Sequence, residues 1–377
     1  MKKIMIIFVL LCGGWSKGQI ASQANLQTQS GYEFNIFKFP ESFFNSDTNT
    51  LMEKDEIYRS SFFQQTSARV LFTKKMGRKG NISLRLQPRA RFYFEDSALD
   101  YYTIYSRLRY QNTFRRNTKW EIIGRYNFRE RDGENLDDSE LRTPLGYGHL
   151  ELSTSLAFRL YPQHRGKLSL RYANRDYKKG LEDNLHYNLY GAHLVFRNVF
   201  RRLAGYHSYG LELDVSRRIY ERVFTDPTES IEERDWSYAQ VDGFYRYPIS
   251  KTWQLRSGFA WGNRKDKNED KFSYTEIRPS LHLSYKGKRF SMNFTGSYTA
   301  RNFKVLRAND SEGNDLGLLK FDYTRLQLKA EHQLSDQLVM TFNGYINNRD
   351  SNRTNVNKLF FRSYDYYYTA VGLRFDF

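Results

Sequence analysis

A strict alternation of apolar and polar residues, kept over unusually long stretches, is the feature that most constrains this chain. In segment 81–95 one face is apolar throughout, from Ile82 to Phe94, and the other face carries several arginines. Successive side chains of a strand point to opposite sides, so this segment is predicted to be a two-faced β-strand. Its length exceeds the usual strand and suits the roughly 9–11 residues with which a tilted strand crosses a bilayer.

The same period of two recurs along the chain and predicts about sixteen strands. They lie near residues 31–40, 62–74, 81–95, 101–114, 119–131, 147–162, 167–177, 184–198, 207–221, 236–248, 252–264, 272–286, 289–302, 320–334, 337–348 and 362–377. We also expect a β-bulge near Gly191, where the phase of the alternation slips.

The connections between these strands fall into two classes that interleave. Seven are short and turn-like, and eight, including 41–61, 132–146 and 303–319, are mostly longer and polar. Short turns at one end and long loops at the other are typical of membrane barrels of the outer-membrane type. The alternative is a soluble β-sandwich, which would need shorter strands with turn signals every 8–12 residues.

The two ends of the chain carry the clearest signals of its destination. Residues 1–18 have a basic start, an apolar stretch and small residues before a cleavage point between Gly18 and Gln19, as in a secretory signal peptide. Cys12, the single cysteine, leaves with this peptide, so the mature chain forms no disulfide. The last strand alternates to its end, with Phe375 and the terminal Phe377 on one face.

This combination resembles the bacterial outer-membrane β-barrels, porin-like proteins with a terminal aromatic residue. The composition is similar to that of Bacteroidota barrels, and no specific porin family is matched. The resemblance implies an all-β fold: a transmembrane antiparallel up-and-down barrel of about sixteen strands, with both termini periplasmic. It also implies location in the outer membrane of a Gram-negative cell, with outer-membrane lipid and the barrel-assembly machinery as partners. The expected domains are a signal peptide (1–18), a periplasmic segment (19–30) and the barrel (31–377).

The charge of the chain is concentrated on one face of these strands. Lys and Arg number 59 against 42 Asp and Glu, a formal net charge of +17. The alternation predicts that the pore lining includes Arg85, Arg89, Arg91, Arg107, Arg109, Arg125, Arg129, Arg171, Arg256, Arg278, Arg325, Glu212, Asp214 and Asp242. Such arginines can pair with acids and tyrosines and fill the lumen, or can line a pore that favours anions. Most of them lie on the consecutive segments 81–95, 101–114 and 119–131, so we also expect a basic wall that faces a smaller acidic wall, with Glu212, Asp214 and Asp242, across the lumen. Positive charge turned into a barrel does not favour nucleic-acid binding.

Sequence motifs for catalysis or cofactor binding are lacking. There is no phosphate-binding loop, dinucleotide fingerprint, zinc-protease or serine-hydrolase motif, and the acidic stretch 309–315 lacks calcium-loop spacing. His149 shares a predicted face with Glu151, Ser153 and Ser155, which we interpret as polar lumen residues. We therefore expect no cofactor, no metal and no enzyme activity.

Passive diffusion of small hydrophilic, anionic solutes across the outer membrane is the leading function. The alternative is a barrel plugged by loop 41–61 that serves a secretion, uptake or surface-display complex. A third hypothesis is an outer-membrane enzyme that acts on lipids. Conductance, co-purification and lipase activity would separate the three.

Overall fold

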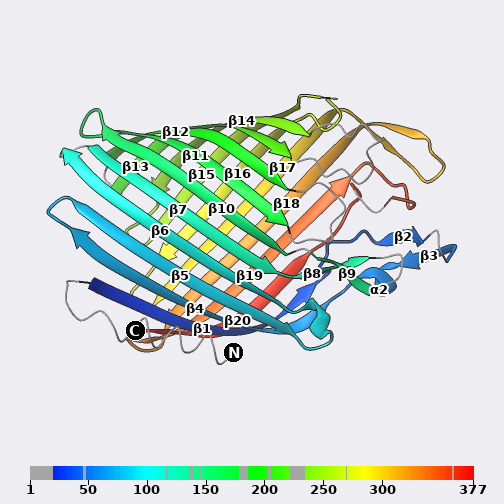
Figure 1. Cartoon of the computed structure of the whole chain (residues 1–377), viewed down its shortest axis with the longest axis horizontal. Helices are drawn as coiled ribbons and strands as arrows, with labels where there is room; N and C mark the ends of the chain where they lie inside the picture. Colours follow the sequence, from blue (N-terminus) through cyan, green and yellow to red (C-terminus); the bar gives the residue numbers. More distant parts are fainter. Residues whose placement is uncertain are drawn as a thin grey trace.

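The computed structural model describes residues 20–45, 48–115, 118–135, 140–144, 146–177, 186–202, 205–220, 234–268, 270–358 and 361–377. Sixteen antiparallel strands form one closed barrel, in which strands that follow one another along the wall are neighbours (Figure 1). The predicted fold class and strand number are therefore confirmed. No helix in the described ranges is long and apolar enough to cross a membrane.

The strands of the wall follow in chain order. They are β1 (Ile20–Phe34), β4 (Ser61–Met76), β5 (Gly80–Tyr93), β6 (Tyr101–Arg115), β7 (Thr118–Glu130), β10 (Tyr147–Arg159), β11 (His164–Tyr177), β12 (Tyr187–Arg202), β13 (Gly205–Tyr220), β14 (Asp235–Pro248), β15 (Trp253–Asp266), β16 (Tyr274–Lys286), β17 (Phe290–Asn309), β18 (Asp315–Gln333), β19 (Leu338–Ser351) and β20 (Tyr367–Asp376).

The barrel closes where its first and last strands pair. β1 and β20 run antiparallel, from Asn25 opposite Asp376 to Phe34 opposite Tyr367. Gly31 lies at this seam, and a Cβ there would come within 2.1 Å of the carbonyl oxygen of Thr369. Only glycine allows the two backbones to approach so closely. Beyond β20, the backbone N–H of Phe377 donates to the carbonyl oxygen of Ala24 at 2.8 Å, which extends the seam to the last residue.

The first strand corrects our sequence prediction. We expected a strand at 31–40 after a periplasmic segment at 19–30, but β1 begins at Ile20, so residues 20–30 belong to the wall. One face of β1 carries Ser22, Ala24, Thr28 and Ser30 between its few large apolar residues. The two faces of this segment differ too little in hydrophobicity for the alternation to be recognised in the sequence. Pairing with two neighbouring strands holds the segment in the wall. The predicted signal peptide, with Gly18 and Gln19, lies outside the described residues.

Two further expectations were wrong. The register of β12 with both its neighbours continues through Gly191 without the predicted bulge. Residues 303–319 are not an open loop, because β17 and β18 extend into a long hairpin with register shifts between Asn302 and Asn309. Its turn is stabilised by Asp310, whose carboxylate accepts the backbone N–H of Asn314 at 2.8 Å.

The two faces of the wall differ as the alternation predicted. Large apolar side chains are exposed on the outer face, for example Phe92 (51%), Leu152 (48%), Phe259 (54%) and Val371 (52%). A surface of this kind is suited to lipid rather than to water. The residues between them in each strand point into the barrel.

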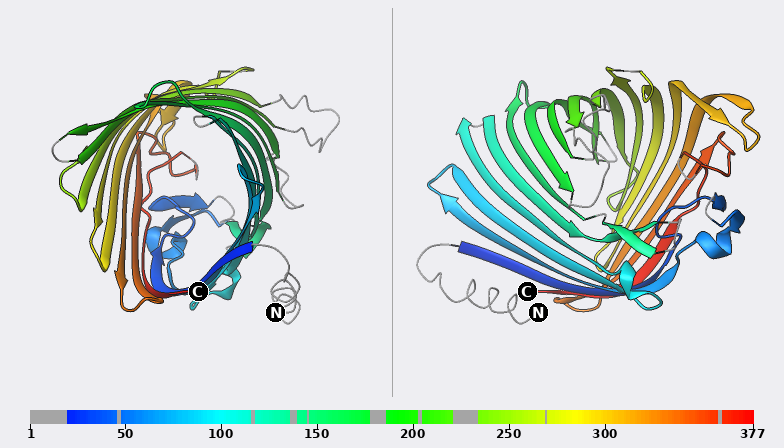
Figure 2. Two further views of the ribbon diagram at one scale, coloured as in Figure 1. Left: turned by 90° about the vertical axis from the view of Figure 1, so that its left-hand side faces the viewer. Right: turned by 45° about the vertical axis from the view of Figure 1, so that its right-hand side comes forward.

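The strand ends joined by the seven short turns lie at one end of the barrel, and those joined by the eight longer connections lie at the other, which we call the loop end (Figure 1). At the loop end, a small hairpin of β2 (Ser42–Asn45) and β3 (Thr50–Glu53) is followed by helix α2 (Lys54–Ile57). A second hairpin, β8 (Asp132–Asn135) with β9 (Glu140–Pro144), and a turn of 3-10 helix, η1 (Ser97–Leu99), lie at the same end (Figure 2).

Candidate functional site: the inner wall of the barrel

All fourteen residues predicted to line a pore lie on the inner face, opposite the exposed apolar side chains. The structure divides their arginines into three groups. Some pair with carboxylates of the same wall, some stack on aromatic rings, and three have neither kind of partner in the described part of the chain.

The first group forms ion pairs along the wall. Arg109 pairs with Glu121 and Arg125 with Glu151, in each case between adjacent strands. Arg171 reaches Asp214 at 2.7 Å, Arg256 reaches Glu212 at 3.6 Å and Arg278 reaches Asp242 at 3.4 Å. These last three pairs each bridge across one intervening strand.

This pairing corrects the field that we expected inside the barrel. The alternation had suggested that Glu212, Asp214 and Asp242 form an acidic wall facing a basic one across the lumen. Each of these acids instead has an arginine partner two strands away on its own wall. For the pair of Arg171 with Asp214, a glycine on the intervening strand leaves room for the arginine side chain. A Cβ at Gly191 would lie 2.8 Å from the Nε of Arg171.

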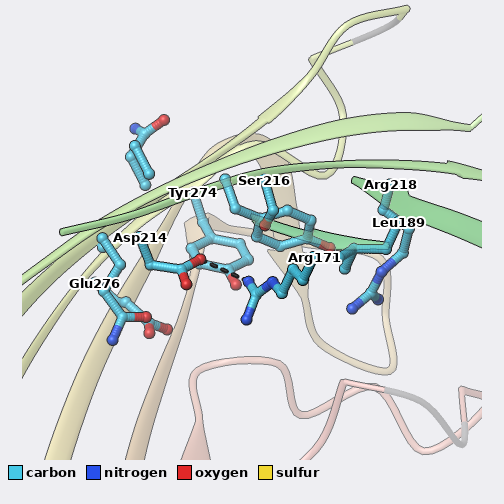
Figure 3. A pocket seen from close by; sticks show the side chains of 12 residues that line it. Arg171, Leu189, Asp214, Ser216, Arg218, Tyr274 and Glu276 are labelled. Carbon is cyan, nitrogen blue, oxygen red and sulfur yellow. Dashed lines mark hydrogen bonds and ion pairs between the residues drawn. The ribbon is translucent and has the colours of Figure 1, made fainter. Parts of the chain in front are cut away.

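A cavity of about 200 Å³ opens beside one of these pairs (Figure 3). Arg171 and Asp214 meet in it, and Arg218, Tyr274 and Glu276 lie around them. Two arginines, Arg171 and Arg218, and two acids, Asp214 and Glu276, line the cavity, so its positive and negative groups are equal in number. This part of the wall is therefore polar but electrically compensated.

The second group stacks on aromatic rings and forms a feature that we did not predict. Near the loop end, arginine on one strand alternates with tyrosine on the next over twelve consecutive strands of the wall. We call this set the Arg–Tyr belt; it comprises Arg91, Tyr101, Arg129, Tyr147, Arg175, Tyr187, Arg218, Tyr238, Arg264, Tyr274, Arg301 and Tyr323.

Guanidinium groups of the Arg–Tyr belt lie over its rings at cation–π distances. Arg218 is 4.4 Å from the ring centre of Tyr187, and Arg301 is 4.2 Å from that of Tyr274. Arg325, beside the belt, lies 5.0 Å from the ring of Tyr323. Each such contact contributes about 0.5–2 kcal/mol, depending on desolvation. The belt accordingly gives a structural role to Arg91, Arg129 and Arg325, which we had predicted as pore residues.

A buried carboxylate anchors the belt at the seam of the barrel. Glu33 on β1 is 4% exposed and pairs with Arg91 on β5. It also accepts hydrogen bonds from the hydroxyls of Tyr93 at 2.7 Å and Tyr366 at 2.8 Å. Arg91 in turn donates to the Gln65 side chain at 2.8 Å from its Nη2. Sequence reasoning missed this network because the pairs join residues up to 333 positions apart.

The loop between β1 and β4 lies beside this network and contacts the loop before β20. Asn35 donates from its side chain to the carbonyl oxygen of Asp365 at 2.8 Å, and the backbone N–H of Phe44 donates to Val356 at 2.9 Å. Lys38 lies 4.7 Å from the ring centre of Tyr366, and burial lowers its pKa. These contacts join the β1–β4 loop to the loop before β20. The hairpin of β2 and β3 lies at the loop end, beyond the ends of the wall strands beside it (Figure 1).

The third group consists of Arg85, Arg89 and Arg107. Among the described residues, no carboxylate pairs with them and no ring lies over them. Arg85 and Arg107 are directly opposite each other on β5 and β6, and Arg107 is opposite Arg125 on β7. Positive charge on this part of the inner wall is therefore compensated only in part.

The described residues do not form a metal site or a catalytic site around His149. Within the described ranges there is no cluster of three or more potential metal ligands. Glu151 pairs with Arg125, so it is not available as a partner that would orient His149.

No family model matches the chain, and no curated protein matches its sequence. Among solved structures, OmpT, an outer membrane protein of Vibrio cholerae, covers 97% of this chain and 99% of its own, at 12% identity and a TM-score of 0.46. An anion-selective porin from Comamonas acidovorans covers 95% and 99%, at 8% identity and a TM-score of 0.44. A double variant of OccD1 (OprD) covers 96% and 97%, at 11% identity and a TM-score of 0.51.

The likeness to OccD1 shows a shared fold, in agreement with the closed sixteen-stranded wall and its apolar outer face. The chain is therefore a porin-like β-barrel of the outer-membrane type.

Proposed function

We propose that the protein is a channel through which small hydrophilic solutes, preferentially anions, diffuse passively across the outer membrane. A barrel of sixteen strands is wide enough to enclose an aqueous channel. The observation that carries the proposal is the third arginine group. Arg85, Arg89 and Arg107 have no carboxylate partner in the described part of the chain, so the inner wall keeps an excess of positive charge there. Low-dielectric walls focus such a potential and favour anions.

The proposed orientation follows from the same fold. The short turns and both termini would face the periplasm and the loop end would face outward, as in other barrels of this class. The mature chain would begin at Gln19 after cleavage behind Gly18, which mass spectrometry of the purified protein would test.

Conductance across a planar bilayer tests the channel. We expect stepwise currents in potassium chloride, and a reversal potential of the sign for anion preference when the two sides differ in salt concentration. Changing Arg85, Arg89 and Arg107 together to Gln should reduce this preference. High salt should also reduce it, since the Debye length falls to about 3 Å at 1 M. Cation preference of the unmodified protein would contradict the anionic part of the proposal.

The alternative is a closed barrel that serves a larger outer-membrane complex. The β1–β4 loop favours it, because its hairpin lies within the outline of the wall when the barrel is viewed end-on (Figure 2) and its contacts with the loop before β20 hold it there. Absence of any conductance, together with co-purifying proteins, would support this alternative and rule out the channel.

A further inference from the structure

We propose that the inner wall carries a specific binding site for a small oxoanion, a phosphate or sulfate group, between β4, β5 and β6. The inference deepens the proposed function, because it names a ligand class and a place on the wall. A cavity of about 190 Å³ lies there. Its lining comprises Arg85, Arg107, Arg109, Thr73, Ser83, Asn81 and Leu71.

The charged groups that line this cavity are all positive. Three guanidinium groups, two hydroxyls and one amide line it, whereas no carboxylate does. The carboxylate nearest in the network, Glu121, already pairs with Arg109 and lies 3.5 Å from the Nζ of Lys167. Hydroxyls and amides can donate to an anion but do not neutralise positive charge. The cavity in Figure 3 differs, since Asp214 and Glu276 balance its arginines.

The strand register makes the cavity energetically unfavourable when no anion is bound. Arg85 and Arg107 are direct cross-strand partners, and like charges in such positions destabilise a sheet. The Nε atoms of both arginines are buried and have no hydrogen-bond partner among the described residues. An anion with several acceptor oxygens would offset this repulsion and could accept hydrogen bonds from both guanidinium groups.

Phosphate and sulfate meet that requirement. Their oxygens accept forked hydrogen bonds from guanidinium groups, and such charge-assisted bonds are stronger than neutral ones. A halide lacks separate oxygens and cannot accept from both arginines and from the hydroxyls of Thr73 and Ser83 in the same way. The site should therefore distinguish oxoanions from chloride, which a general positive potential would not do.

Calorimetric titration of the purified barrel in detergent, in a chloride buffer, tests the site. We expect saturable binding of inorganic phosphate and of sulfate. The double variant Arg85→Gln/Arg107→Gln should weaken binding about tenfold or more, because two charged donors are lost. The matched variant Arg256→Gln/Arg278→Gln removes two inner arginines that already have acidic partners, and it should change the affinity little. Heat-modifiable gel mobility would show that each variant is folded.

The outcomes separate this inference from the channel itself. Conductance without saturable oxoanion binding, or equal loss of binding in the two variants, would overturn the site and leave the channel standing. Binding of oxoanions without conductance would support the site and contradict the channel. A parallel titration with glucose 6-phosphate distinguishes a phosphate ester from free phosphate as the natural ligand. Tighter binding of glucose 6-phosphate than of inorganic phosphate indicates an organic ester.

A second inference rests on a different observation, the charge of the short-turn end. Its seven turns and the strand ends beside them, which we call the short-turn rim, comprise residues 74–80, 115–119, 159–165, 201–205, 248–253, 286–290 and 333–338. These residues include 15 Lys and Arg and a single acid, Asp336. Thirteen of the basic side chains are described and all thirteen are exposed. The connections at the loop end are by contrast richer in Asp and Glu than in Lys and Arg.

We infer that the short-turn rim binds the anionic phospholipid headgroups of the adjacent leaflet. Exposed aromatic residues of the outer face lie beside it, such as Phe114 (51%) and Tyr247 (42%). Aromatic residues of this kind settle at the depth of the headgroups. The basic side chains of the turns are then within a Debye length of the lipid phosphates, where each contributes about 1 kcal/mol.

Association of spin-labelled lipids with the reconstituted barrel tests this inference. In phosphatidylcholine vesicles, we expect labelled phosphatidylglycerol to associate more strongly than labelled phosphatidylcholine. Changing Lys74, Lys75, Arg78 and Lys79 to Gln should reduce this preference. The control changes four exposed lysines of the loop end to Gln: Lys54, Lys304, Lys320 and Lys358. Equal association of the two lipids, or an equal effect of both variants, would overturn the inference and would point to an acidic protein partner instead.

Discussion

Glu33 and Arg91 form a buried ion pair between β1 and β5, across the intervening strand β4, at the point where the barrel closes. The same carboxylate accepts hydrogen bonds from Tyr93 and Tyr366, the second of which directly precedes β20. One side chain thus connects the first strand of the wall to β5 on one side and to the start of the last strand on the other.

Replacing Glu33 by Ala should destabilise the barrel more than any other single change on the inner wall. It leaves the buried guanidinium of Arg91 without its carboxylate, a loss of about 3–5 kcal/mol. The midpoint of urea unfolding, followed by heat-modifiable mobility, measures the effect. Asp242→Ala is the control, because its ion pair with Arg278 is longer and more exposed. Equal losses in the two variants would contradict the assigned role.

The assignment of outer and inner faces can be tested on two successive residues of β14. Val241→Arg places a charge on the lipid side at mid-strand and should cost about 2–4 kcal/mol. Gln240→Arg places the same side chain inside, beside Asp242, to which Gln240 donates at 2.6 Å. We expect this second variant to assemble normally. The measurement is the amount of folded protein in the outer-membrane fraction, and equal sensitivity would invert the face assignment.

The terminal aromatic residue should matter for assembly rather than for stability. Phe377 is 75% exposed, so its ring has few contacts to lose, while its backbone bonds to Ala24 do not depend on the side chain. Phe377→Ala should lower the amount of barrel in the outer membrane while the unfolding midpoint of the assembled fraction stays the same. Normal outer-membrane levels of the variant would show that this ring is not read during assembly.

The contact between the two loops at the mouth should depend on pH. Burial and the nearby Glu41 raise the pKa of the Asp365 carboxyl. An acid with a raised pKa in the folded state stabilises the structure below its unfolded pKa of about 3.9, and this contribution disappears as pH rises through the folded pKa. Hydrogen exchange at Asn35 and Tyr366, corrected for its intrinsic pH dependence, should therefore show more protection in acid. Asp365→Asn should remove the dependence, and unchanged pH dependence in that variant would exclude Asp365 as its source.

Much of the fold could be predicted, because lipid on one side and a polar interior on the other impose the same period on every strand. The outward positions of Phe92 and Phe259, and the inward positions of Arg85 and Arg278, follow from alternation alone. The prediction was wrong for β1, whose outer face carries small polar residues such as Ser22 and Thr28 and shows little contrast.

The pattern of partners on the inner wall was decided by the closed barrel. Whether Arg171 faces the lumen is a local property, but its pairing with Asp214 requires the register of three strands and the missing side chain of Gly191 between them. The Arg–Tyr belt likewise appears only when strands separated by loops of different lengths are brought to one height. Local alternation determines the face of each side chain, whereas strand register and barrel closure determine its neighbours, because these depend on hydrogen bonds between residues far apart in the chain.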